Sequence, residues 1–182
     1  ITSVQGAVNG TVALVGGNVV FTPAANYNGP ASFTYTVSDG NGGTSTATVT
    51  VNVAAVNDAP VAQAGAFTVA EDAAVVNGAV TATDVDAGAT LSFSLNGAAP
   101  AGLTFNSNGT YSFNPANAAY QSLGVNQQTV LTVPYTVTDN AGATSTANLV
   151  ITVTGTNDTP VANANTVAAT EDNALTIAPA TL

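Results

Sequence analysis

The chain has 182 residues and a formal net charge of −10, because its 10 acidic residues are accompanied by no Lys, Arg or His. Because it contains neither His nor Cys, thiolate chemistry, Ser–His and Cys–His nucleophile pairs and the usual zinc ligands are excluded. Without Lys or Arg it cannot neutralise phosphates, which argues against nucleic-acid binding, while 46% apolar residues suffice for packed cores.

Short stretches of alternating polar and apolar residues predict β-strands along the whole chain, and no stretch shows sustained helical periodicity. Thr and Val are abundant in these stretches and favour the pleated surface of a sheet. Gly16-Gly17 and Asn108-Gly109 predict two-residue hairpin turns. No apolar run approaches the roughly 20 residues of a membrane span, so we expect no membrane insertion. The predicted strands are residues 12–14, 19–21, 32–37, 47–53, 91–95, 103–105, 110–113 and 148–153.

The sequence repeats itself at an offset of 100 residues. Tyr35-Thr36-Val37-Ser38-Asp39 recurs as Tyr135-Thr136-Val137-Thr138-Asp139, Asn57-Asp58 recurs as Asn157-Asp158, and Glu71-Asp72 recurs as Glu171-Asp172. Motifs nearer the start of each copy match at a shorter offset, which places extra residues in the loop at 121–128. A unit of about 100 residues made of short strands is typical of an immunoglobulin-like sandwich, so we predict an all-β chain of tandem Greek-key β-sandwiches.

The frame of the repeat predicts one complete domain between two partial ones. Two interpretations follow: the chain is a slice of a longer tandem array, or the incomplete ends of neighbouring molecules complete each other by strand exchange. The expected division is the C-terminal part of a repeat at 1–55, a linker at 56–61, a complete domain at 62–155, a linker at 156–161, and the N-terminal strands of a further repeat at 162–182.

The acidic residues are concentrated in the repeated motifs and in the pair Asp84 and Asp86. Residues two apart in an extended segment point to the same side, so the two carboxylates of this pair should lie together. Carboxylates gathered at one end of a sandwich repel one another, and the chain offers no cation of its own. A hard divalent cation with oxygen ligands would relieve that repulsion, and Ca²⁺ accepts 6–8 such ligands in irregular geometry.

Several of these motifs resemble those of cadherin repeats. The segment 80–88, which contains Asp84-Val85-Asp86, resembles the DxD region, and residues 56–60 and 156–160 resemble the linker between repeats. Residues 67–72 resemble the first strand with its calcium-binding Glu. Over nearly its whole length, the chain is most similar to the bacterial cadherin-like and VCBS repeats of large RTX-type, type I secreted adhesins.

The resemblance implies Ca²⁺ at the junctions between domains. Asp39 and Glu171 would belong to junctions whose other halves are not in this sequence. Unlike cadherins, residues 120–128 carry no acidic motif, so we expect one or two ions per junction instead of three. The implied ligands are Asn57, Asp58, Asp84, Asp86 and Asp139 at the first junction, and Glu71, Asn157 and Asp158 at the next.

The functional prediction is a non-enzymatic extender segment of a bacterial adhesin at the cell surface or in a biofilm, whose partners are neighbouring repeats. Asp39 and Asp139 also suit simple turn positions, and Asp58 and Asp158 suit linker residues before Pro. Catalysis by paired carboxylates is disfavoured because the flanking aromatic and amide groups of sugar chemistry are missing. Two alternatives remain: a filament or matrix subunit assembled by strand complementation between copies, and a glycan- or protein-binding module using the loop at 121–128.

Overall fold

The computed structural model describes residues 1–162 and 164–177, and these residues form strands, turns and connections but no helix. The first module comprises a three-stranded sheet of order β1-β4-β5 and the hairpin β2-β3. Its strands are β1 (Ser3–Val8), β2 (Gly10–Val15), β3 (Asn18–Pro23), β4 (Gly29–Ser38) and β5 (Thr44–Val53).

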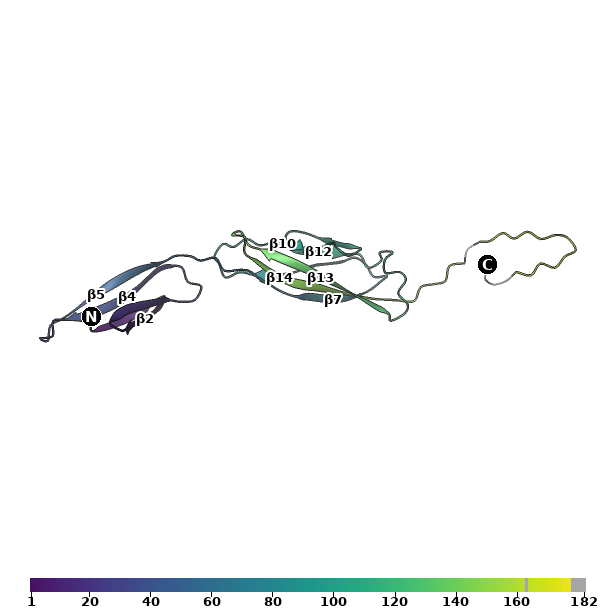
Figure 1. Ribbon diagram of the computed structural model, residues 1–182. Coiled ribbons are helices and arrows are strands. Elements are labelled where there is room, and N and C mark those ends of the chain that lie inside the picture. Colours follow the sequence, from purple (N-terminus) through teal and green to yellow (C-terminus); the bar gives the residue numbers. More distant parts are fainter. Residues whose placement is uncertain (163, 178–182) are drawn as a thin grey trace.

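The second module carries a four-stranded sheet of order β10-β13-β14-β7, a three-stranded sheet of order β11-β12-β8, and the short pair β6-β9. Figure 1 shows the two modules end to end, joined by an extended segment, so that the chain forms an elongated particle. The strands of the second module are β6 (Val61–Ala62), β7 (Gly65–Ala70), β8 (Val76–Ala79), β9 (Ala82–Thr83), β10 (Ser92–Leu95), β11 (Leu103–Phe105), β12 (Thr110–Phe113), β13 (Gln128–Thr138) and β14 (Thr144–Thr154).

The core of the second module lies between its two larger sheets. Phe113 of β12 is fully buried, and so are Tyr135 of β13 and Ile151 of β14 in the opposing sheet. In β13 and β14 the buried residues occupy every second position, as the period-two pattern of a strand requires. The Tyr135 hydroxyl donates a hydrogen bond to the Gln63 carbonyl, which fixes the segment between β6 and β7 onto the sheet. The all-β sandwich prediction is therefore confirmed.

The first module reproduces only part of this arrangement. Its strands β1, β4 and β5 correspond to β10, β13 and β14, and its hairpin β2-β3 corresponds to β11-β12. Phe21 of β3 stacks on Phe33 of β4 with 5.9 Å between ring centroids. Among its large apolar side chains, only Phe33 is buried, because the described residues provide no strand on the far side of β5.

One predicted hairpin is confirmed and the other is wrong in its geometry. Gly16 and Gly17 both have positive φ and directly join the paired residues Val15 and Asn18, as a two-residue turn requires. Asn108-Gly109 instead belongs to a longer loop, because Asn106 and Thr110 pair through the Asn106 N–H and the Thr110 carbonyl, 2.9 Å apart. Gly109 alone is left-handed, with φ +84°, and its carbonyl accepts a hydrogen bond from the Val80 N–H at 2.9 Å. That tertiary contact sets the shape of the loop.

The connection between β12 and β13 is longer than its counterpart between β3 and β4, in keeping with the extra residues expected near 121–128. It packs onto the second module instead of projecting from it. Tyr120 is buried, its ring lies 5.6 Å from that of Phe113, and its hydroxyl donates to the Ala101 carbonyl at 2.7 Å. The Gly155 N–H donates to the Gln127 carbonyl at 2.8 Å, which fastens the end of the loop to the exit of β14.

Beyond β14 the chain runs away from the second module (Figure 1). The described residues 156–162 and 164–177 include no strand, although residues 162–182 are expected to begin a further repeat; residue 163 and residues 178–182 lie outside the described part. A strand needs a neighbouring strand for its ladder of hydrogen bonds, and none of the described strands pairs with this segment. No helix of the described residues is long and apolar enough to cross a membrane.

Candidate metal centres

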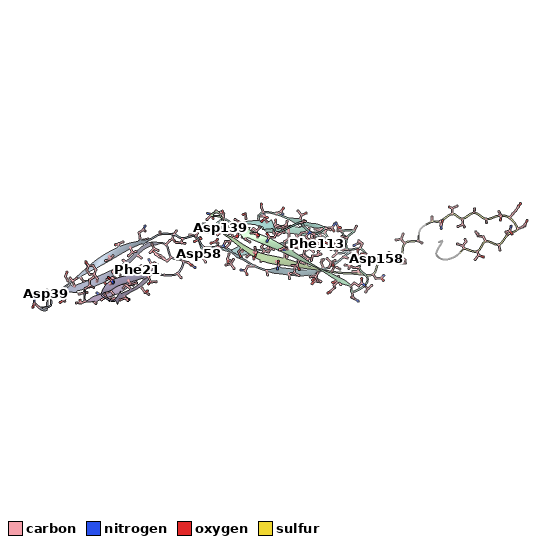
Figure 2. The ribbon with its side chains drawn as sticks, viewed as in Figure 1. Phe21, Asp39, Asp58, Phe113, Asp139 and Asp158 are labelled. Atoms are coloured by element: carbon pink, nitrogen blue, oxygen red, sulfur yellow. The ribbon has the colours of Figure 1, made fainter. Side chains whose placement is uncertain are left out.

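The acidic side chains gather at the ends of the modules. Asp58 and Asp139 lie where the first module meets the second, Asp158 lies at the opposite end of the second module, and Asp39 lies at the free end of the first (Figure 2). This placement follows from the topology, because strand ends and linkers converge at the two poles of a sandwich.

At the far end of the second module, carboxylate oxygens of Glu71, Asp72 and Asp158 all lie within 4.8 Å of one another; we call this the Glu71 cluster. Glu71 follows the last residue of β7, and its N–H donates to the Thr154 carbonyl at 3.0 Å. Thr156 connects the two acids of the turn: its N–H donates to Glu71 Oε1 at 2.8 Å and its hydroxyl to Asp72 Oδ2 at 2.6 Å. The end of β14 thus positions the turn that follows β7.

The second carboxylate oxygen of Glu71 has no protein partner. Glu71 is 0% exposed, and its Oε2 is buried without a hydrogen bond. A buried carboxylate oxygen without a partner is costly, and its neighbours in the cluster are two further acids. At an effective dielectric near 20, two carboxylates about 4 Å apart repel by about 4 kcal/mol, and by less where solvent screens them. The arrangement is suited to a cation.

The first junction holds the other predicted ligands; we call Asn57, Asp58, Asp84, Asp86 and Asp139 the Asp58 site. The Asp58 N–H donates to Asp86 Oδ2 at 2.8 Å, and the Asp86 N–H donates to Asp84 Oδ1 at 2.9 Å. The Oδ2 atom of Asp84 is buried without a partner, like Oε2 of Glu71. The linker is therefore tied to the Asp84-Val85-Asp86 segment through the Asp86 carboxylate.

Asp139 is 6% exposed and is strongly hydrogen-bonded. Its Oδ2 accepts from Asn57 Nδ2 at 2.7 Å, and its Oδ1 accepts from the N–H groups of Ala141 and Ala143, each at 2.8 Å. The Asn57 hydrogen bond, assisted by these backbone donors, holds the pKa of Asp139 below its usual 3.8, although burial acts to raise the pKa. Asp139 is therefore an anion that closes the turn after β13.

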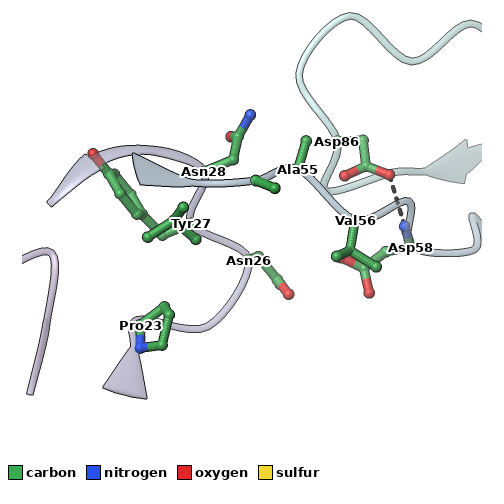
Figure 3. Close-up of a pocket in the computed structure, with 10 residues that line it drawn as sticks. Pro23, Asn26, Tyr27, Asn28, Ala55, Val56, Asp58 and Asp86 are labelled. Carbon is green, nitrogen blue, oxygen red and sulfur yellow. Dashed lines mark hydrogen bonds between the residues drawn. The ribbon is translucent and has the colours of Figure 1, made fainter. Parts of the chain in front are cut away.

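The structure brings the Asp58 site together less tightly than the Glu71 cluster. Among the described residues, the Glu71 cluster is the single group in which three such acids lie within 4.8 Å of one another. Two adjoining hollows of about 310 and 320 Å³ lie beside Asp86 at this junction. Asn26 and Asn28 of the first module line both hollows, and Figure 3 shows them across from Val56 and Asp58. The space beside the acids is thus open and partly polar.

The remaining acids behave differently. Asp39 repeats the turn-closing role, since its Oδ1 accepts from the N–H groups of Asn41 at 2.8 Å and Gly43 at 2.9 Å. Glu171 and Asp172 are exposed, and Asn157 donates from its side chain to the Asp158 carbonyl at 3.3 Å. The structure adds Asp72 to the acids expected at the second junction. The recurrence of Glu-Asp as a pair was the available signal for it.

Comparison with known proteins relates this geometry to a family. Residues 57–155 match the family model described as a bacterial cadherin-like domain, and residues 1–52 match that of a bacterial Ig domain. The chain belongs to the bacterial cadherin-like family. Domains of this family are structural adhesion modules and not enzymes. No curated protein matches the sequence.

Solved cadherin structures share the fold of this bacterial cadherin-like chain. Mouse cadherin-23 EC22-24 is similar with a TM-score of 0.55 at 22% identity, covering 83% of this chain and 52% of that one. Human protocadherin-24 EC1-2 has a TM-score of 0.57 at 21% identity, covering 87% and 81%. Mouse protocadherin-24 EC1-3 has a TM-score of 0.53 at 17% identity, covering 85% and 57%. The chain thus spans about half the length of the cadherin-23 structure.

Proposed function

We propose that this bacterial cadherin-like chain is a structural extender segment of a secreted surface adhesin, with Ca²⁺ at the junctions between consecutive sandwiches. The observation that carries the proposal is the Glu71 cluster. Glu71 is fully buried and keeps one carboxylate oxygen without a partner, and it lies in a cluster with two more acids in a chain without a single Lys, Arg or His. Cadherin-like domains typically bind calcium, which agrees with this donor set.

In this proposal each junction binds one or two ions, and all of the ligands are oxygen atoms. Glu71, Asp72, Asn157 and Asp158 form the second site, in which Thr156 holds the two acids of the turn in place. The first site uses Asp58, Asp84, Asp86 and Asp139, together with Asn57 once its side-chain oxygen, instead of its Nδ2, faces the ion. The bound ion would neutralise the acids and connect a linker to the end of a sheet.

Bound Ca²⁺ would make the junctions between consecutive sandwiches rigid. Modules of extracellular proteins bind Ca²⁺ with dissociation constants of about 10⁻⁴–10⁻³ M, so the junctions order outside the cell and loosen where calcium is scarce. Free calcium 100-fold above the dissociation constant adds about 2.7 kcal/mol of stability. We infer that the chain acts within an RTX-type, VCBS-containing adhesin at the bacterial surface or in a biofilm. There, 1–55, 62–155 and 162–182 would be consecutive repeats joined by linkers at 56–61 and 156–161.

Calcium titration of the purified chain tests the proposal. We expect a binding isotherm in calorimetry and a higher unfolding temperature of the second module. Glu71→Gln should weaken binding at the Glu71 cluster about tenfold or more, because it removes the buried charge. Glu171→Gln, the same substitution at the equivalent position of the repeat, is the matched control and should leave the affinity unchanged when the protein is dilute and monomeric.

No binding heat and no thermal shift at calcium concentrations well above about 10⁻³ M would contradict the proposal. Equal affinities of Glu71→Gln and the parent chain would remove the Glu71 cluster from it. The alternative of a binding module stays open: the connection that contains 121–128 is anchored by Tyr120 and Gly155, while most residues of 121–128 are exposed.

A further inference from the structure

The loop between β11 and β12 presents an exposed asparagine in the tripeptide Asn108-Gly109-Thr110. In a secreted protein, Asn-x-Thr is the acceptor motif for N-linked sugars, provided that the Asn is accessible at the surface. So short a motif is also frequent by chance, so the surroundings of the side chain have to decide. The chain carries the motif at Asn9 and Asn157 as well, which makes a comparison within one molecule possible.

The amide group of Asn108 is held in one orientation by Thr110. Its Oδ1 accepts from the Thr110 N–H at 3.1 Å and from the Thr110 hydroxyl at 2.7 Å, while Thr110 Oγ1 itself accepts from Asn106 Nδ2 at 2.9 Å. Two donors at one end of the amide group determine that this end is the oxygen. The Nδ2 end of the exposed Asn108 then donates to no group of the described residues. An amide nitrogen is thus left available at the surface.

The backbone beneath this side chain is fixed to the neighbouring sheet. Gly109 is left-handed, and its carbonyl accepts from the Val80 N–H at 2.9 Å. Thr110 begins β12 and lies opposite Ala79 of β8. The loop therefore presents the Asn108 amide from a firm base.

The same tripeptide at Asn9-Gly10-Thr11 has the opposite arrangement. There the Nδ2 atom of Asn9 donates to the Tyr27 hydroxyl at 2.8 Å and to the Pro30 carbonyl at 3.1 Å. A sugar on this nitrogen would replace one of its two hydrogens and would have to displace at least one of these acceptors. The identical motif is therefore occupied by the fold.

The third motif is also engaged. Asn157 Nδ2 donates to the Asp158 carbonyl at 3.3 Å, next to the Glu71 cluster. Among the three motifs in the described part of the chain, only that of Asn108 combines an exposed side chain with an amide nitrogen that has no partner.

We propose that Asn108 is an acceptor site for N-linked glycosylation, with a sugar activated as its diphosphate ester as the donor. A glycosyltransferase catalyses the step. The bond that forms joins Asn108 Nδ2 to the anomeric carbon of the sugar, and the bond that breaks joins this carbon to the diphosphate, which leaves with the electron pair. One proton of Nδ2 passes to a base of the transferase. This inference goes beyond the proposed function and requires no calcium.

Incubation of the folded chain with a transferase and its donor tests the proposal. One arm uses a soluble N-glycosyltransferase with uridine diphosphate glucose, and the other a membrane-bound transferase with a lipid diphosphate oligosaccharide, so the arms distinguish the two sources of the sugar. Trypsin is useless for mapping because the chain has no Lys or Arg. A protease that cleaves after Asp separates the three motifs, since Asp39, Asp86 and Asp139 lie between them, and mass spectrometry of the peptides then locates the sugar.

We expect the sugar at Asn108, with an occupancy of Asn9 lower by about tenfold or more, because modification there costs hydrogen bonds of the fold. Asn108→Gln should abolish the main product, whereas Asn9→Gln, the matched control in the same tripeptide, should leave it unchanged. Thr110→Val should also abolish it and Thr110→Ser should largely retain it, since the hydroxyl is kept. Circular dichroism checks that each variant is folded.

No sugar at Asn108 in either arm would overturn the proposal. Equal occupancy of Asn9 and Asn108 in the folded chain would overturn it as well, because the free amide nitrogen would then have decided nothing. The proposed function is tested separately, since calcium binding at the Glu71 cluster is measured on the unmodified chain.

Discussion

At the scale of single residues, one carboxylate closes the turn at the end of β13 and another closes the turn at the end of β4. Asp139 and Asp39 each accept two backbone N–H groups through one oxygen, in turns that differ by the repeat offset. What distinguishes them is the other oxygen of Asp139, which accepts from Asn57. A residue of the linker therefore tunes a turn of the second module.

This contact predicts a pH effect. In the folded chain the pKa of Asp139 lies below 3.8, so the ionised form favours folding; the stabilisation is present above that pH and is lost as the pH falls through the lowered pKa. Asn57→Ala should raise the pKa of Asp139 towards 3.8, because the largest cause of the lowering is removed. The measurement is an NMR titration of the Asp139 carboxyl carbon in calcium-free solution.

Asn157→Ala is the control for this titration, since the Asn157 side chain donates to a backbone carbonyl and not to a carboxylate. It should leave the pKa of Asp139 where it is. An unchanged pKa in Asn57→Ala would show that the backbone donors of the turn suffice alone.

The sequence identifies individual acids better than their groupings. Repetition singles out Glu71, Asp58, Asp139 and Asp158, because a motif is visible along the chain. It does not show that Asp72 joins Glu71 and Asp158, because that depends on Thr156 holding a turn from a distant part of the chain. Nor does it show that the Asn57 amide group faces Asp139 as a donor.

At the scale of elements, alternation predicts the long strands well and the turns less well. The strand predicted at 32–37 lies within β4, and the one at 148–153 lies within β14, because a half-buried strand must alternate. The type of the loop between β11 and β12 could not be predicted from Asn108-Gly109. It depends on the backbone hydrogen bond between Val80 and Gly109, which links segments far apart in the sequence.

Gly109 therefore predicts a stability difference. A Cβ atom there would lie 2.8 Å from the Val80 carbonyl oxygen at φ +84°, whereas Gly88 has a similar φ of +81° and open space around it. Gly88→Ala should cost about 1–2 kcal/mol from the left-handed backbone alone. Gly109→Ala should lower the free energy of unfolding by more than that, because the loop must also move away from β8. Urea unfolding followed by circular dichroism compares the two variants, and equal losses would contradict the argument.

At the scale of the whole molecule, the two modules and the two acidic ends lie along one line (Figures 1 and 2). The linker between the modules is held by carboxylates at the Asp58 site and borders open hollows on the side of the first module. We therefore expect its geometry to depend on what neutralises those acids.

Small-angle scattering of the dilute chain tests this dependence. With calcium we expect a long particle with a well-defined maximum dimension. After chelation the average should become more flexible or more compact, since repulsion within the Asp58 site loosens the linker. Asp86→Asn should shift the calcium-bound profile towards the chelated one, while Asp39→Asn, at the free end of the first module, should not. Identical profiles with and without calcium would argue against a calcium-dependent junction.

The parallel pairing of β7 with β14 has a mechanical consequence. A force that pulls on both ends of the second module enters before β7 and leaves after β14, so it drives two parallel neighbours in opposite directions along their length. The hydrogen bonds that join residues 65–70 of β7 to residues 149–154 of β14 are then loaded in shear. They bear the force together instead of opening one after another. Such a clamp resists extension through a slow unfolding rate more than through equilibrium stability.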